Sequence, residues 1–281
     1  MALIRWIVYS NLWVSLVAPS MLWSTAVLLG EKLDGSIYVF VFSATLFTYN
    51  IQRLYKATDF ISNSVLYRHR WIWENRKALW LLTYLSGLST AICLFFVPFC
   101  FLAWLFPAGI ISAFYFIPFY RSGNKWKRLR DVPLLKIVLV SFVWAWVAVF
   151  CVAQILEKPK DTWIPVFVFQ FFFCFAVTIP FDIRDAKFDR AEGTKTFVSI
   201  WGVNKAKCLS ATCFIISLAA LYFSDLPLLS FLVIILFFVF GCVSVWFSSP
   251  SRHELYYGFW LDGLFILQGP VMFSAVYIWT I

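Results

Sequence analysis

The residues best suited to chemistry are three aspartates in the segment Asp182-Ile-Arg-Asp-Ala-Lys-Phe-Asp189. Asp182, Asp185 and Asp189 lie at positions i, i+3 and i+7, so a continuous helix would place their carboxylates on one face. Carboxylates this close repel one another unless a cation lies among them, and hard oxygen ligands suit Mg²⁺. The alternative is a solvated segment whose charge is balanced by the three cations that interleave the aspartates. The spacing alone leaves both interpretations open.

A second polar group ends an earlier apolar run and consists of Asn50, Arg53 and Lys56. The two cations could simply anchor the inner end of a membrane helix. Asn50 is by type more often a helix cap or an interhelical bond than a ligand. Asp262 is nearly alone as an ionisable residue inside an apolar run, and such a group usually faces a cavity or a partner.

The elements that must position these residues are membrane helices. The chain of 281 residues is 62% hydrophobic and only 13% charged, whereas soluble domains are roughly 45–50% apolar. This composition excludes a soluble enzyme and a disordered chain, and the apolar runs are too long for a membrane barrel. We expect an all-α bundle that forms one membrane domain, residues 1–281. The shortage of polar groups near the membrane midplane argues against a transporter. The nine predicted spans are 6–29, 36–56, 77–97, 99–119, 134–155, 162–181, 205–224, 226–248 and 257–280.

The basic residues predict the orientation of this bundle. If the N-terminus is inside, 20 of the 23 Lys and Arg residues fall in or beside inside loops, and only three lie outside. The net charge of +9 therefore indicates topology and membrane-lipid contact, with no nucleic acid as partner. We expect a multi-pass integral membrane protein with a cytoplasmic N-terminus, of the kind found in a bacterial inner membrane. The seven Cys form no CxxC pair, which argues against a disulfide framework or a zinc site.

The aspartate segment and its continuation resemble the second signature of the UbiA superfamily of intramembrane prenyltransferases. That signature is a DxxxD after the sixth helix, which Asp185 and Asp189 match. A Gly, a Lys/Thr pair and a later Gly follow in the family, and the matching residues here are Gly193, Lys195, Thr196 and Gly202. The family also has nine helices and cytoplasmic catalytic loops, so the resemblance covers the whole chain in architecture.

Two further matches are weaker. The stretch from Tyr115 to Arg121 resembles a Tyr-x-x-Pro segment with a basic residue after it, and Lys136 lies near the family's helix-five lysine. The first signature, NxxxDxxxD, is where the chain departs from the family. Only Asn50 is kept, and the two aspartate positions hold Leu54 and Thr58.

The displaced Asp59 lies one residue beyond the family position, a rotation of about 100° on a helix of ~3.6 residues per turn. The departure leaves two readings. In one, Arg53 and Lys56 neutralise a diphosphate directly and so replace one metal ion. In the other, the chain has lost the power to ionise a prenyl diphosphate.

The resemblance implies transfer of an isoprenyl group from an isoprenyl diphosphate to a lipophilic acceptor, which we expect to be aromatic. It implies a catalytic set of Asp185, Asp189 and Asn50, with Mg²⁺ as cofactor on Asp182, Asp185 and Asp189. The residues expected to contact the substrate are Arg53, Lys56, Arg121, Lys195 and Tyr115. The alternative is a non-catalytic protein of the same fold that binds a polyprenyl lipid or a protein partner.

Overall fold

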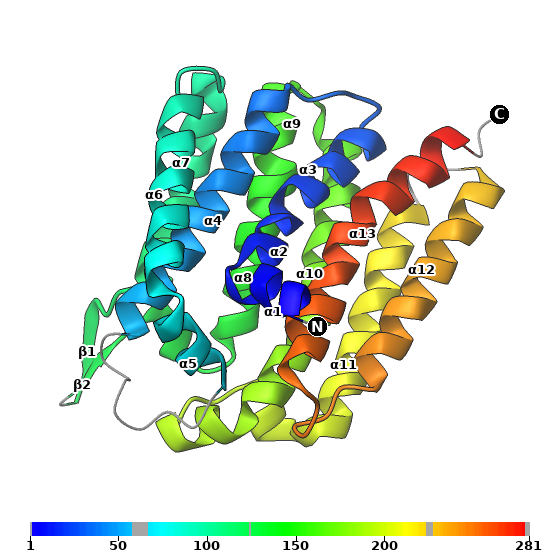
Figure 1. Ribbon diagram of the computed structural model, residues 1–281. Helices are drawn as coiled ribbons and strands as arrows, with labels where there is room; N and C mark the ends of the chain where they lie inside the picture. The colour runs from blue at the N-terminus through cyan, green and yellow to red at the C-terminus, as the bar shows by residue number, and fades with distance from the viewer. Residues whose placement is uncertain (1, 58–66, 124, 223–226, 279–281) are drawn as a thin grey trace.

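The structure is a computed structural model that describes residues 2–57, 67–123, 125–222 and 227–278. Helices dominate it, joined by one two-stranded hairpin and short 3₁₀ or π-helical turns (Figure 1). In chain order the elements are α1 (Ala2–Tyr9), α2 (Leu12–Ser15), α3 (Val17–Leu28), α4 (Gly35–Ala57), α5 (Tyr67–Glu74), α6 (Arg76–Cys93), α7 (Phe99–Phe116), β1 (Tyr120–Ser122), β2 (Lys125–Lys127), η1 (Leu129–Asp131), α8 (Leu135–Ala145), η2 (Trp146–Phe150), α9 (Cys151–Ile155), α10 (Lys160–Glu192), α11 (Phe197–Tyr222), α12 (Leu228–Trp246), η3 (Tyr256–Leu261), α13 (Asp262–Phe273) and η4 (Ser274–Ile278).

The all-α membrane character of the chain is confirmed, whereas the count of nine spans is not. Among the described residues, six helices are long and apolar enough to cross a membrane, and the bent α1–α3 segment would make a seventh. Helices α4 and α6 coincide with the predicted runs 36–56 and 77–97 but are not among those candidates. Ser, Thr and Tyr residues interrupt both helices, which lowers their mean hydropathy.

The first predicted run is broken in the structure. Helix α1 and the helical stretch Leu12–Leu28 meet at an angle of 56°. The break falls at Ser10 and Asn11, and Asn11 has a left-handed backbone with φ of 65°. Asn tolerates this conformation better than most residues because its short side chain bonds locally. The break places Asn11 inside the bundle, where only 1% of its surface is exposed.

Helix α10 is the central element of the bundle. It packs against α8 on one side and α11 on the other, while α3 packs against α13 and α4 against α6. Its 33 residues give a length of about 50 Å, well beyond the roughly 30 Å apolar thickness of a bilayer. The helix therefore continues past its apolar part and carries the aspartate segment at its far end.

Several phenylalanines of α10 belong to the core. Phe169 and Phe173 are fully buried, and the rings of Phe173 and Phe237 stack with centroids 5.7 Å apart. Phe238 and Phe265 also contact Phe173, at 5.8 and 5.5 Å between centroids. Ring pairs at these distances add stabilisation beyond simple burial. These particular residues therefore serve helix packing.

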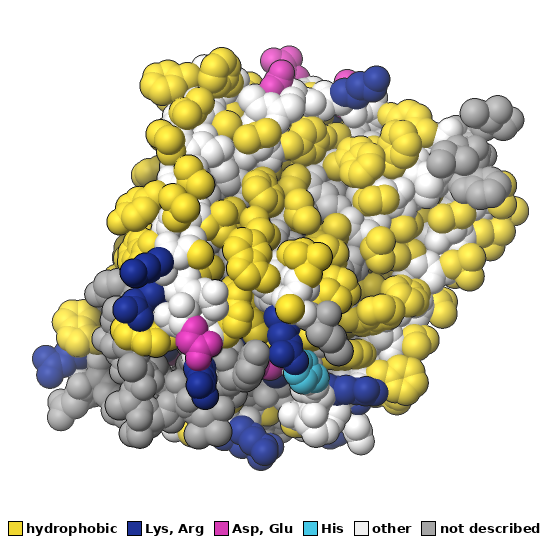
Figure 2. Space-filling model, in the orientation of Figure 1, with side chains coloured by type: hydrophobic (Ala, Val, Ile, Leu, Met, Phe, Trp, Pro, Cys, Tyr) yellow, Lys and Arg dark blue, Asp and Glu magenta, His cyan; other side chains and the backbone are white. Residues whose placement is uncertain are grey.

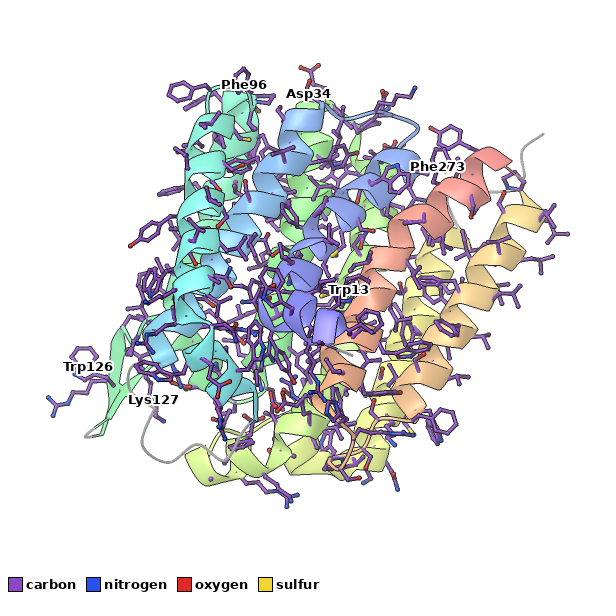
Figure 3. All side chains as sticks on the ribbon, viewed as in Figure 1. Trp13, Asp34, Phe96, Trp126, Lys127 and Phe273 are labelled. Carbon is purple, nitrogen blue, oxygen red and sulfur yellow. The ribbon has the colours of Figure 1, made fainter. Side chains whose placement is uncertain are left out.

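Charge is distributed unequally between the two ends of the bundle. Figure 2 shows a broad apolar band across the middle, with Lys and Arg gathered at the lower end. The hairpin β1–β2 projects from that end with Trp126 and Lys127, opposite the end that carries Asp34 and Phe96 (Figure 3). We call the lower end, which holds the end of α10 and the hairpin, the basic end.

Candidate functional site

The aspartate segment is helical and lies beyond the predicted end of the span at residue 181, so the i, i+3, i+7 spacing places the three aspartates on one face of α10. Helix α10 runs without interruption to Glu192 and ends at Gly193, whose left-handed backbone has φ of 74°. Glycine is the residue that adopts this conformation most easily, and the turn lets the Thr194 amide donate to the Asp189 carbonyl at 2.8 Å. The three aspartates thus lie on a rigid element, at the basic end of the bundle.

Lys136 bridges two of these aspartates. Its Nζ lies 2.8 Å from Oδ1 of Asp182 and 3.3 Å from Oδ2 of Asp189. Only 2% and 4% of the two aspartate side chains are exposed, so both carboxylates are removed from water. A protein ammonium therefore stands between these two carboxylates, where one of the two readings of the sequence placed Mg²⁺.

Lys136 reaches this position because of how α8 begins. Leu134, just before the helix, has a left-handed backbone with φ of 63°, and its amide donates to the Lys195 carbonyl at 2.9 Å. This bond ties the start of α8 to the turn after α10. The tie sets the first turn of α8 against the aspartate face.

Asp185 has a different cation. Arg184 forms a two-pronged contact with it, Nε to Oδ1 at 2.7 Å and a terminal nitrogen to Oδ2 at 2.9 Å. The guanidinium also lies over the rings of Phe181 and Tyr257, at 5.2 and 5.5 Å from the centroids. Asp262, the first residue of α13, lies within electrostatic reach of Arg184.

These ion pairs define how well the site fits Mg²⁺. In the described part of the chain, no three His, Cys, Asp or Glu side chains converge as a metal cage. Both carboxylate oxygens of Asp182 are nevertheless buried without a regular hydrogen bond. Lys136 contacts one of them, Oδ1, as an ion pair. Mg²⁺ is commonly held by one or two carboxylates completed by substrate phosphates. The pair Asp182 and Asp189 fits that mode of binding, and a cage made by protein alone does not fit.

Tyr115 lies within electrostatic reach of Asp182 and Asp189. It is on the last turn of α7, where Arg130 is 5.8 Å from its ring centroid. The charges of Asp182, Asp189 and Lys136 all act on its hydroxyl. Arg130, which the sequence did not single out, also acts electrostatically on Asp185 and Asp189.

The end of α4 contributes Asn50 and Arg53. Asn50 is 2% exposed, and its Oδ1 accepts a 2.6 Å hydrogen bond from Nδ2 of Asn11. The Asn50 Nδ2 and one terminal nitrogen of Arg53 are buried without a partner among the described residues. Leu54 packs with Ile72 and Leu79, so this former signature position serves the core.

The remaining predicted residues are less well placed. Arg121, on β1, and Lys195, in the turn after α10, are exposed, and their substrate contacts stay predictions. Thr58, Asp59 and the side chain of Lys56 lie outside the described residues.

Arg68, on α5, is a site residue that the sequence did not reveal. Its guanidinium lies 5.5 Å from the ring centroid of Tyr9, and its Nε is buried without a partner among the described residues. Burial lowers the pKa of Arg68 to about 10, and the nearby charge of Arg184 adds to this effect. Glu254 and Asp262 are the acidic groups within its electrostatic reach.

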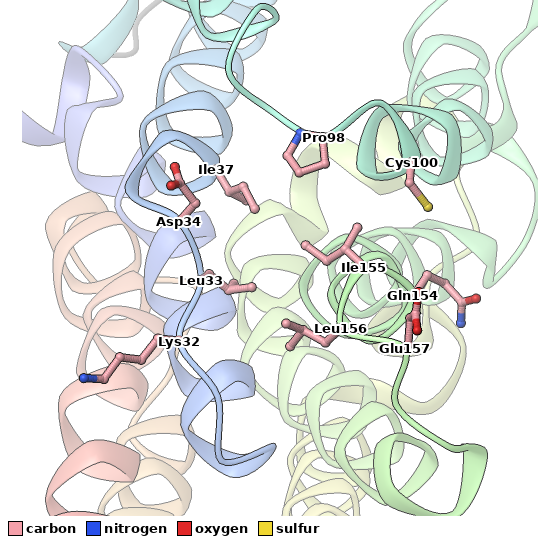
Figure 4. A pocket seen from close by; sticks show the side chains of 10 residues that line it. All are labelled: Lys32, Leu33, Asp34, Ile37, Pro98, Cys100, Gln154, Ile155, Leu156 and Glu157. Carbon is pink, nitrogen blue, oxygen red and sulfur yellow. The ribbon is translucent and has the colours of Figure 1, made fainter.

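Two open surface pockets lie apart from this charged cluster. One, of about 290 Å³, is at the opposite end of the bundle, where Leu33, Pro98 and Ile155 line it (Figure 4). The other, of about 360 Å³, lies between α12 and η3 and is lined by Phe240, Tyr256 and Trp260. Neither contains an aspartate of α10.

The fold and the site define a multi-pass α-helical membrane protein with a buried cluster of aspartates and basic residues at one end. The model of the UbiA prenyltransferase family matches residues 72–262, and the chain belongs to that family. The resemblance seen in the sequence is therefore confirmed. No curated protein sequence matches the chain.

Solved structures of the same fold cover almost the whole chain. The UbiA homologue from Archaeoglobus fulgidus bound to GPP and Mg²⁺ is similar over 96% of this chain and 99% of its own, at 13% identity and a TM-score of 0.62. The same homologue bound to DMAPP and Mg²⁺ covers 95% and 99%, at 15% identity and a TM-score of 0.61. A structure of digeranylgeranylglyceryl phosphate synthase covers 98% of both chains, at 9% identity and a TM-score of 0.55. Identities this low show a shared fold alone.

Proposed function

We propose that this protein is an intramembrane prenyltransferase that binds the diphosphate of an isoprenyl substrate at the charged cluster of α8 and α10. Family membership and the related structures with GPP or DMAPP and Mg²⁺ support the substrate class. The observation that carries the proposal is the buried group of Asp182, Asp189 and Lys136. Carboxylates and an ammonium held together at this depth are costly to bury and typically mark a functional site.

Asp182 and Asp189 would hold Mg²⁺, with Asp185 beside them. When bound, the ion supplies electrostatic stabilisation of the departing diphosphate. Lys136 and Arg130 add positive charge on the same side, and Tyr115 offers a hydroxyl to the headgroup. Asn50 and Arg53 face the headgroup from α4 with N–H groups.

The reaction breaks the bond between the allylic carbon and the diphosphate oxygen, and the electron pair leaves with the diphosphate. A nucleophile of the lipophilic acceptor, which we propose to be aromatic, forms the new carbon bond and then loses a proton. The Arg184 guanidinium that bonds Asp185 also lies over the aromatic rings of Tyr257 and Phe181. Apolar surface therefore adjoins the charged groups. Such rings stabilise positive charge on an allylic fragment.

The basic end is placed on the cytoplasmic side in this proposal. The chain would act as one membrane domain over residues 1–281, with its N-terminus inside, as in a bacterial inner membrane. The distribution of 20 inside against three outside basic residues supports this orientation.

A second function is favoured by one specific observation. All three aspartates already have protein cations, and Leu54 stands buried where the first signature would carry an aspartate. A protein whose aspartates are neutralised by its own cations could bind a polyprenyl lipid or a protein partner without turnover.

Turnover separates the two functions. Purified protein in lipid nanodiscs is incubated with Mg²⁺, a panel of isoprenyl diphosphates and lipophilic aromatic acceptors, and products are followed by mass spectrometry. A prenylated product formed by the wild type and absent for Asp189→Asn supports the transferase. Tight binding of a prenyl diphosphate without product for any acceptor supports the binding protein.

A further inference from the structure

The end of α4 and the helix α5 present a set of hydrogen-bond donors without acceptors. The buried donors are Nδ2 of Asn50, a terminal nitrogen of Arg53 and Nε of Arg68, each without a partner among the described residues. Buried donors without a partner are destabilising, so a set of three indicates that another group satisfies them. Because all three are donors and two are cationic, that group is an anion.

The three donors lie on facing surfaces of two packed helices. Asn50, Arg53 and Leu54 share one face of α4, since they are three and four residues apart. Arg68 and Ile72 share one face of α5 in the same way, and Ile72 belongs to the same buried cluster as Leu54.

Helices α1 and α2 close the third side of this arrangement. The ring of Tyr9 lies under the Arg68 guanidinium and contacts Trp71 edge-on at 5.5 Å. Two residues on, Asn11 donates to Oδ1 of Asn50 and so leaves the Asn50 Nδ2 as the free donor. The broken first helix thereby orders both sides of the donor set.

Arg68, one of the three donors, lies near the aspartate segment of α10. Arg68 and Arg184 are within electrostatic reach of one another, and Arg184 is bonded to Asp185. Glu254 and Asp262 also lie within electrostatic reach of Arg68, yet no described residue accepts a hydrogen bond from its Nε. That donor therefore remains available to an anionic ligand.

We propose that Asn50, Arg53 and Arg68 form a metal-independent subsite for one phosphate group of the isoprenyl diphosphate. This inference rests on the proposed function and deepens it, because the protein's own donors would hold one phosphate while the carboxylates of α10 serve the cation. A guanidinium can donate two parallel hydrogen bonds to a phosphate, and such charge-assisted hydrogen bonds are stronger than neutral ones.

Binding with and without divalent metal tests the subsite. Geranyl diphosphate and inorganic pyrophosphate are titrated calorimetrically into the full chain in nanodiscs, with Mg²⁺ or with EDTA. The wild type should retain weaker but measurable binding in EDTA. Arg68→Ala should weaken binding about tenfold or more in both conditions, the loss expected for one charge-assisted contact.

Arg70→Ala is the matched control, since Arg70 is on the same helix, 80% exposed, and paired with Glu74. It should bind like the wild type. Arg68→Lys keeps the charge and should recover part of the affinity, which separates ligand contact from misfolding. Wild-type binding with Mg²⁺ that vanishes in EDTA, or Arg68→Ala binding like the wild type, would overturn the subsite and leave the proposed function standing. Absence of wild-type binding even with Mg²⁺ would remove both.

Discussion

Lys136 and Asp182 form a buried ion pair at 2.8 Å between the first turn of α8 and the far end of α10. The same ammonium also reaches Asp189, at 3.3 Å. Because the two carboxylates lie on one helix face, their mutual repulsion would be severe without it. Lys136 thus holds two acidic groups together in a place largely removed from water.

Replacing Lys136 should expose this dependence. Lys136→Met leaves two buried carboxylates uncompensated, so the free energy of unfolding should fall by about 3–5 kcal/mol. Mg²⁺ should stabilise the variant more than the wild type, because the ion can replace the missing charge between the carboxylates. Thermal unfolding followed by tryptophan fluorescence, at several Mg²⁺ concentrations, measures both effects.

Lys187→Met is the control for Lys136, because Lys187 is exposed on the same stretch of α10 that carries the aspartates. It should unfold like the wild type at every Mg²⁺ concentration. Equal Mg²⁺ responses in Lys136→Met and the wild type would contradict the assignment of this position to a cation.

Gly202 should be required for the geometry after the aspartate segment. Its φ of 80° and ψ of 169° interrupt α11, in a region that essentially only glycine adopts. A Cβ added to this residue would meet no neighbouring atom within 4 Å, so the expected loss for Gly202→Ala is purely conformational. We expect about 1–3 kcal/mol of destabilisation, measured by thermal unfolding.

Gly35→Ala is the comparison for Gly202→Ala. Gly35 begins α4 and likewise has open space around it, but its backbone is not in the left-handed region. Equal stability of the two variants would show that Gly202 is not under conformational constraint.

The orientation of the bundle predicts a labelling pattern. A cysteine in place of Trp126, which is 66% exposed on the hairpin, should resist a membrane-impermeant maleimide in intact cells. Asp34→Cys, at the opposite end, should react. The background should lack the exposed Cys100 and Cys208. Labelling of position 126 from outside, with protection at position 34, would reverse the topology.

Much of this arrangement could be predicted from the sequence because it depends on local periodicity. The apolar runs locate the helices, and the spacing of Asp182, Asp185 and Asp189 predicts that they share a face. The motif glycines are explained as well, since Gly193 and Gly202 have positive φ where the chain turns. These features follow from one segment at a time.

The other half of the site depends on contacts between distant segments. Lys136 lies near the family's helix-five lysine in the sequence, but only the tie between Leu134 and Lys195 shows which carboxylates it meets. The burial of Asn11 is seen only in the folded bundle, where it donates a hydrogen bond to Asn50 of α4. Arg68 likewise resembles any basic loop residue until α5 is packed against α1 and α4.

The central claim is that the carboxylates of α10 mediate Mg²⁺-dependent binding of an isoprenyl diphosphate. The most direct measurement is the affinity for geranyl diphosphate as a function of Mg²⁺ for the wild type, Asp189→Asn and Asp161→Asn. Asp161 is an exposed acid in the first turn of α10, at the other end of the helix, and so serves as the control. We predict that Mg²⁺ strengthens binding to the wild type and Asp161→Asn, and that Asp189→Asn loses this strengthening. Equal Mg²⁺ dependence in Asp189→Asn and the wild type would contradict the account.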